Sequence, residues 1–246
     1  TTATPFYQDI SFKINGANTK AGRFTLFGMA GKSKIEFLHT KTDSTDLFAD
    51  PTKDSYFTSD IALAGVKHFI RVGEKSYINT VIGGTYAASN FNLDTIGNTE
   101  QNIVRVTENK ATQIRYSVNS SFNSKVNSKL FIKAGVIDEV INLNLFYRVK
   151  EDNSQWNQKW DYNDYTSLIQ GYAHAKYNFN DNVTLNVGVH SQFLTLNNSF
   201  SIEPRAGIKY QLNNKNTVSL GYGMHSQMQP TDVYFHRELQ ANGTYD

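Results

Sequence analysis

The clearest pattern in the sequence is an uninterrupted alternation of residue character from Ser199 to Leu212. Every second residue from Phe200 onward is apolar, and the residues between are polar, charged or glycine. A period of two is typical of a β-strand. Fourteen residues in alternation exceed the about 5 to 6 residues of an ordinary strand. The stretch therefore predicts an unusually long strand with one apolar face.

A lipid bilayer accounts for this length. Ten residue steps separate Phe200 from Tyr210, and at about 3.3 Å per step and a tilt of about 40° the strand rises roughly 25 Å. That height matches the lipid-facing band of an outer-membrane barrel, with the two aromatic rings at its interfaces. We therefore expect the apolar parity to face lipid and the charged parity to face the lumen.

The same alternation recurs along the chain and predicts about ten strands. Short turns are centred near residues 18, 74, 126, 181 and 214, and longer polar connections alternate with them, except for a brief connection near Asn197. Such an asymmetry between the two ends is typical of outer-membrane barrels. The tail from 227 to 246 reads as a loop. The expected strands are 6–14, 23–39, 59–72, 77–93, 113–119, 130–148, 169–179, 183–190, 199–212 and 217–225.

Two positions predict local irregularity. Between residues 130 and 148 the apolar parity switches from even to odd, which predicts a β-bulge near Ile137 to Glu139. Pro204 lacks the N–H that a closed ladder needs. We expect it at a bulge, or where its nitrogen faces a gap in the pairing.

Composition agrees with strands that are apolar on one face only. Mean hydropathy is −0.48, and the longest apolar run, Ile61 to Val66, is far too short for a membrane helix.

A net charge of +2 without a run of basic residues indicates no nucleic-acid partner, and zero cysteines exclude disulfides. Residues 1–5 lack the features of a signal peptide, so we expect a mature chain or a piece of a longer one.

Several stretches of this sequence resemble the barrel of TonB-dependent outer-membrane receptors, particularly the SusC-like or carboxypeptidase-regulatory-domain branch. The resemblance is most specific at Pro204-Arg205, Gly221-Tyr222-Gly223 and His225-Ser226-Gln227, and it extends to FYQDISFKI and GRFTLFGMAGKSK near the start. It implies a barrel of about 22 strands, an N-terminal plug and a segment that binds TonB.

The resemblance gives the expected fold and location. The fold class is all-β, an antiparallel transmembrane β-barrel in the outer membrane of a Gram-negative cell. Residues 1–246 would form one partial barrel domain, with the plug and the remaining strands elsewhere in a parent chain. We expect the strands at 6–14 and 218–224 to be bare edges, because long charged lumen residues would crowd a closed ten-strand barrel.

Three groups of side chains are candidates for function. Glu203, Arg205 and Lys209 share the lumen parity, either as an ion-pair ladder within the wall or as a docking face for the plug. Lumen-facing candidates also include the histidines. Aromatic residues in or beside an external loop at 151–164 are suited to the interfacial girdle or to contact with a ligand or partner protein. The histidines are His174, His190 and His225; the aromatics are Trp156, Trp160, Tyr162 and Tyr165.

No catalytic, cofactor or metal motif accompanies these candidates. Lumen histidines could bind a metal, but no HxH or HExxH spacing appears, and Gly221-Tyr222-Gly223 lies within a strand, not before a helix. We therefore expect a non-enzymatic protein without a cofactor. The resemblance implies TonB-powered uptake of a nutrient or other large ligand. The alternatives are a structural subunit of an outer-membrane complex, with surface lipoproteins as partners, and a complete small porin.

Overall fold

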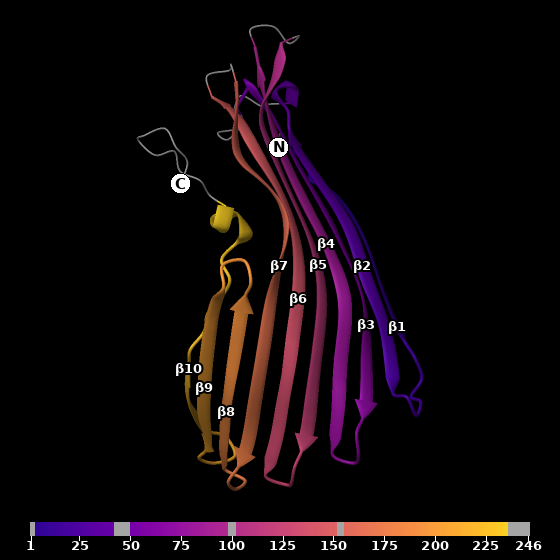
Figure 1. Cartoon of the computed structure of the whole chain (residues 1–246), viewed down its shortest axis with the longest axis vertical. Coiled ribbons are helices and arrows are strands. Elements are labelled where there is room, and N and C mark those ends of the chain that lie inside the picture. The colour runs from indigo at the N-terminus through magenta and orange to yellow at the C-terminus, as the bar shows by residue number, and fades with distance from the viewer. Residues whose placement is uncertain (1–2, 42–49, 98–101, 152–154, 236–246) are drawn as a thin grey trace.

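The computed structural model describes residues 3–41, 50–97, 102–151 and 155–235, and within them the chain forms a single antiparallel sheet. Ten strands lie side by side in sequence order, as Figure 1 shows. Two short 3₁₀ helices, η1 (His39–Lys41) and η2 (Thr231–Phe235), flank the sheet. The strands are β1 (Phe6–Asn15), β2 (Arg23–Phe37), β3 (Lys53–Arg71), β4 (Ser76–Ile96), β5 (Ile103–Lys125), β6 (Leu130–Glu151), β7 (Gln155–Asn178), β8 (Val183–Leu194), β9 (Ser199–Gln211) and β10 (Thr217–Gly223).

The lower end of the sheet in Figure 1 carries the short turns that the sequence predicts. Three of them use an asparagine in the same way. The side-chain oxygens of Asn127, Asn180 and Asn213 each accept two backbone N–H groups from residues two and three positions later. These Asx turns supply local hydrogen bonds that stabilise the chain reversals.

The upper end differs from the prediction because the strands continue where polar loops were expected. The fifth strand begins at Ile103, and the seventh at Gln155. The expected external loop at 151–164 is therefore mostly part of β7, and the prediction of a loop there was wrong. Polar side chains at the upper ends of β5 and β7 still alternate between the two faces of the sheet. Polarity alone therefore did not distinguish a loop from a strand there.

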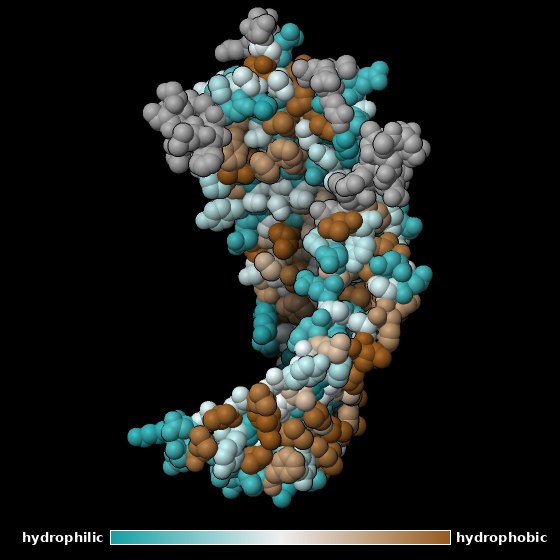
Figure 2. All heavy atoms as spheres, turned by 90° about the vertical axis from the view of Figure 1, so that its left-hand side faces the viewer, coloured by the Kyte–Doolittle hydropathy of each residue, from teal (hydrophilic) through white to brown (hydrophobic). Residues whose placement is uncertain are grey.

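The two faces of the sheet differ in exposure, as the alternation predicts. On β9, Phe200 and Ile202 are 62% and 57% exposed, whereas Glu203 on the opposite face is 2% exposed. We call the face that carries Glu203 the inner face and the other the outer face. Figure 2 shows the bowed molecule from its β10 side, with hydrophobic side chains gathered over the lower, curved part.

Strand β6 contains no bulge near Ile137 to Glu139, so that prediction was wrong. Its register with both neighbours is continuous through this stretch, and its first irregularity lies at Tyr147/Arg148. The parity switch instead marks a change in which face is apolar. Below it Val136 points outward, and above it Ile141 and Leu143 point inward and are fully buried.

The buried inner residues of β6 form the apolar core of the described chain. Ile141, Leu143 and Leu145 are at most 5% exposed. Burial of each such side chain contributes about 1.5 to 3 kcal/mol. The residues packed against them are Ala111, Trp160, Tyr162, Met228 and Phe235. The core therefore joins the upper wall to the chain that follows β10.

Pro204 lies where its nitrogen faces a gap, as predicted. The β9–β10 ladder ends at the pair Arg205 and Gly223, and one further bond runs from the Met224 N–H to the Pro204 carbonyl. Because the N and O of one residue point to the same side of an antiparallel strand, the proline nitrogen faces the side that β10 leaves. The register with β8 is unbroken.

The first and last strands of the sheet, β1 and β10, are edges with a neighbour on one side only. Strand β1 pairs with β2, β10 pairs with β9, and no ladder joins β1 to β10 among the described residues. All residues of β1 and of β10 are exposed. The ten strands do not close into a ring in this structure. In the described parts of the chain, no helix is both long and apolar enough to cross a membrane.

The buried face of β6 gives a direct test of the corrected register. Replacing Leu143 with Ala should lower the free energy of unfolding by about 2 to 5 kcal/mol, because it leaves a cavity in the core. The matched variant Asn144→Ala, on the exposed outer face, should change it by no more than about 0.5 kcal/mol. Urea unfolding in detergent measures both. Equal losses would contradict the assigned faces.

Candidate functional site

The inner face carries one buried carboxylate, that of Glu203 in the middle of β9. Glu203 as a whole is 2% exposed. A buried charge is costly unless a counter-charge and hydrogen bonds compensate for it. The neighbours of Glu203 supply both, so the residue is the centre of an organised polar site.

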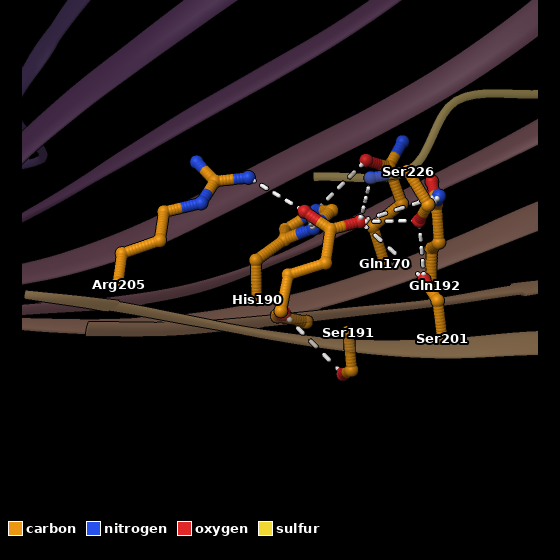
Figure 3. Close-up of polar contacts among 9 residues, drawn as sticks. Gln170, His190, Ser191, Gln192, Ser201, Arg205 and Ser226 are labelled. Atoms are coloured by element: carbon orange, nitrogen blue, oxygen red, sulfur yellow. Dashed lines mark hydrogen bonds and ion pairs between the residues drawn. The ribbon is translucent and has the colours of Figure 1, made fainter. Parts of the chain in front are cut away.

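Cationic and neutral donors approach the Glu203 carboxylate. In Figure 3, Arg205 lies on one side of the site, and Ser226 and Ser201 lie on the other. Its Oε2 atom accepts from Nη2 of Arg205 at 2.6 Å and lies 3.1 Å from Nδ1 of His190. Its Oε1 atom accepts from the hydroxyl of Ser226 at 2.6 Å and from the Ser226 backbone N–H at 3.2 Å. Arg205 is two residues away on the same strand, so the alternation itself brings it to the same face.

Further polar side chains complete the site, and two of them, Gln192 and Ser201, also donate to Oε1 of Glu203 at 3.4 Å. Gln192 Nε2 donates to the Ser226 hydroxyl at 2.6 Å, and that hydroxyl lies 2.7 Å from the hydroxyl of Ser201. Nε2 of His190 lies 3.1 Å from the side-chain oxygen of Gln170. The donors and acceptors come from β7, β8, β9 and the chain after β10. Such a connected network fixes the relative positions of the segments that contribute to it.

Ser226 belongs to a segment that turns inward after β10. We call residues 224–235 the inner segment. Beyond its polar contact at Ser226, the segment packs Met228 and Phe235 against the β6 core, and the rings of Phe235 and Tyr162 lie 4.0 Å apart. A cavity of about 220 Å³ remains between the segment and the wall, bounded in part by Leu168 and Tyr234. The inner segment is thus anchored at two places, one polar and one apolar.

The structure brings together two members of the predicted charged row. Glu203 and Arg205 form an ion pair, whereas Lys209 is exposed and has no ion-pair partner among the described residues. A separate inner pair joins Arg115 to Glu139 at 3.1 Å. The predicted ladder is therefore a compact site around one carboxylate.

The three predicted histidines do not share one set of contacts. His190 bonds to Glu203, whereas His174 and His225 are exposed and make no hydrogen bond within the described chain. Across the described residues, no group of three histidine, cysteine or acidic side chains is arranged to hold a metal ion. The histidines thus give no sign of a shared metal centre.

The four residues of the predicted aromatic cluster lie at three separate places on β7. Trp156 lies under the guanidinium of Arg148, 4.2 Å from its central carbon, and Lys150 lies 5.0 Å from the same ring. Trp160 and Tyr162 instead pack on the β6 core. Tyr165 is 65% exposed on the outer face. The four residues do not form one surface.

Sequence reasoning missed the neutral members of the Glu203 site and a second polar cluster. Gln170 and Gln192 share the inner parity, so cross-strand pairing was a usable signal, but Ser226 follows the last strand and carried none. The second cluster lies at the upper end, where the His39 backbone N–H and Nδ1 atom contact Asp54, which is 4% exposed. Arg105 pairs with Asp94 beside it. These contacts tie the upper ends of β2 to β5 together.

The double anchoring of the inner segment leads to a prediction for Ser226. The Ser226→Ala variant loses a hydroxyl donor to a charged acceptor, an interaction of about 1.5 to 3 kcal/mol. Amide hydrogen exchange within residues 224–235 should therefore accelerate at least tenfold. Ser191→Ala is the control, because the Ser191 hydroxyl makes only a 3.4 Å contact with the Gly171 carbonyl. Unchanged exchange in Ser226→Ala would show that the apolar contacts alone hold the segment.

Comparisons with known proteins found only low structural similarity. No protein-family model matches the chain, and no curated protein matches it significantly. The beta domain of the Bordetella autotransporter BrkA is 12% identical over 90% of this chain and 83% of that one, with a TM-score of 0.45. The translocator domain of NalP from Neisseria meningitidis is 10% identical over 91% and 75%, with a TM-score of 0.41. The outer-membrane transporter YddB from Escherichia coli is 11% identical over 90% and 38%, with a TM-score of 0.45.

Proposed function

We propose that the chain is a section of the wall of an outer-membrane transport barrel. One observation carries this proposal: the same strands expose apolar side chains on the outer face and bury a charged network on the inner face. A soluble sheet places its apolar face against a core. Here the outer face has no covering layer among the described residues, so a lipid environment is the simplest apolar partner.

The outer apolar residues form a band across the sheet. On β2 and β3 the upper limit of the band is the Lys32–Asp60 ion pair, which spans 3.9 Å, and on β6 it is Asn142. Below these positions the outward side chains are mostly apolar or small. The exposed apolar members include Ile10, Phe12, Leu26, Val66, Ile82, Val118, Val136, Ile169, Val189, Ile202, Ile208 and Leu220.

The two edges support a wall that is completed by further strands. An edge in lipid leaves backbone N–H and C=O groups unpaired, at a cost of several kcal/mol for each group. Strands outside these 246 residues would remove that cost and widen the lumen. This arrangement suits the large plugged barrel that the sequence resemblance implies, with about 22 strands.

More specifically, we propose that the parent protein is a TonB-dependent receptor that takes up a nutrient or other large ligand. A plug elsewhere in the parent chain would contact the inner face and connect the barrel to TonB. The Glu203 site positions the inner segment within the lumen, beside the space a ligand would cross. No catalytic step is assigned to the chain.

A second candidate is a structural subunit of an outer-membrane complex that transports nothing. The inner segment favours it, because a polypeptide fixed against the wall by Ser226 and Phe235 reduces the open space inside. Surface lipoproteins or other membrane subunits would be the partners. The ten-strand porin finds no support in the pairing of β1 and β10.

Growth on single nutrients separates these candidates. A strain lacking the gene should grow poorly on one nutrient class if the protein is a receptor, and removal of TonB from the wild type should give the same defect. Replacement of the gene with its Ser226→Ala form tests whether the inner segment limits that uptake. Normal growth on every nutrient, with copurification of a surface lipoprotein, would favour the structural role.

The lipid-facing band leads to a prediction for Ile208, which is 43% exposed on the outer face of β9. Ile208→Arg should destabilise the assembled protein by about 2 to 4 kcal/mol if the position is near the bilayer midplane. Gln211→Arg, on the inner parity of the same strand, should cost much less. Urea unfolding in detergent provides the comparison, and equal midpoints would count against the assigned faces.

A further inference from the structure

One carboxylate lies on the outer face within the apolar band. Asp138 in β6 is exposed and pairs across the sheet with Ile169 on β7 and Val118 on β5. Its neighbours along the strand on the same face are Val136 and Val140. All four surrounding side chains are apolar, and each is at least 36% exposed. A charged group is thus set among side chains that face the proposed lipid.

Asp138 has no counter-charge within the chain. It makes no hydrogen bond or ion pair among the described residues, unlike the outer carboxylate of Asp60, which pairs with Lys32. On the neighbouring strand β5, the outward cation Lys110 lies eight residues above Val118, about 26 Å along the strand. The carboxylate is therefore unpaired at its own level.

The headgroup region lies beyond the reach of this side chain. The next polar outer residue directly above, two places along the outer face, is Asn142. Four residues of tilted strand separate the two, a rise of about 10 Å. An aspartate side chain is too short to span that height. Ionisable residues at such depth are costly and usually mark a partner or a pathway.

The surroundings of Asp138 suit a protein partner. The residues paired with Val136 are Gly171 and Ser120. Val140 pairs with Ser167 on β7 and with Tyr116 on β5, which is 58% exposed. Small side chains let another backbone approach closely within a membrane.

We propose that Asp138 is the centre of a docking surface, on the outer faces of β5, β6 and β7, for a membrane-embedded segment of a different protein that carries a lysine or arginine. The partner's cation pairs with the carboxylate. A second copy of this chain related by a twofold axis through the surface would place two carboxylates together, which disfavours self-association there. This inference rests on the proposed function, because it requires the outer face to lie in lipid.

Photo-crosslinking in the native outer membrane tests this docking. A photoreactive amino acid is placed at Val136 or Val140 of the full-length protein, with Leu220 on the outer face of β10 as the control position. We expect one protein adduct from 136 and 140 but not from 220. Asp138→Asn should reduce its yield at least tenfold, and Asp60→Asn should leave the yield unchanged.

Peptide mapping of the adduct identifies the partner's segment. It should contain a lysine or arginine, and replacing that residue with Asp in a strain that carries Asp138→Lys should restore the adduct. Adducts only with lipid, an adduct with a copy of this chain, an adduct that Asp138→Asn leaves intact, or no adduct would each overturn the docking. Sedimentation with the outer membrane is measured for every variant. Absence of a protein adduct at 136 and 140 when Asp138 is intact, in protein that still sediments there, rejects only the docking. Wild-type protein absent from that membrane rejects the proposed function.

Discussion

Hydrogen bonding between neighbouring strands is the constraint on which the rest of this structure depends. In an apolar medium each backbone N–H and C=O group needs a partner within the protein, and the ordered pairing of ten strands supplies partners wherever neighbouring strands overlap. Because each strand pairs with its neighbours in sequence, the side-chain alternation is in phase across the sheet below the register shifts at Leu93/Asp94 and Tyr147/Arg148. The outer and inner faces are therefore continuous surfaces with separate chemistry.

The inner surface shows how a charge is accommodated in such a wall. Glu203 is buried because the inner segment covers it, and it is tolerated because Arg205, His190 and Ser226 approach its two oxygens. On the outer surface most side chains of the band are apolar, and Asp138 is a charged residue among them. The two acidic residues are thus opposite cases, one satisfied within the chain and one without a counter-charge among the described residues.

The sequence predicted the strands best where the chain crosses the proposed bilayer. The alternation from Ser199 to Leu212 corresponds closely to β9, and the Asn-rich turns lie where expected. The upper ends of β5 and β7 were missed because, above the apolar band, polar side chains occupy both loops and strands. The switch at Ile141 resembled a bulge because a change of medium and a change of register produce the same parity shift. The contact of Ser226 with Glu203 joins residues 23 positions apart and has no local signal.

Cysteine accessibility along β9 tests the central claim most directly, and the chain contains no native cysteine to interfere. Single cysteines replace each residue from 199 to 212 in protein assembled in the outer membrane, and each variant is treated with a water-soluble maleimide. The account predicts protection at 202, 206 and 208 and modification at 207, 209 and 211, in strict alternation. Modification at every position, or protection at every position, would contradict a strand with one face in lipid and the other in a water-filled lumen.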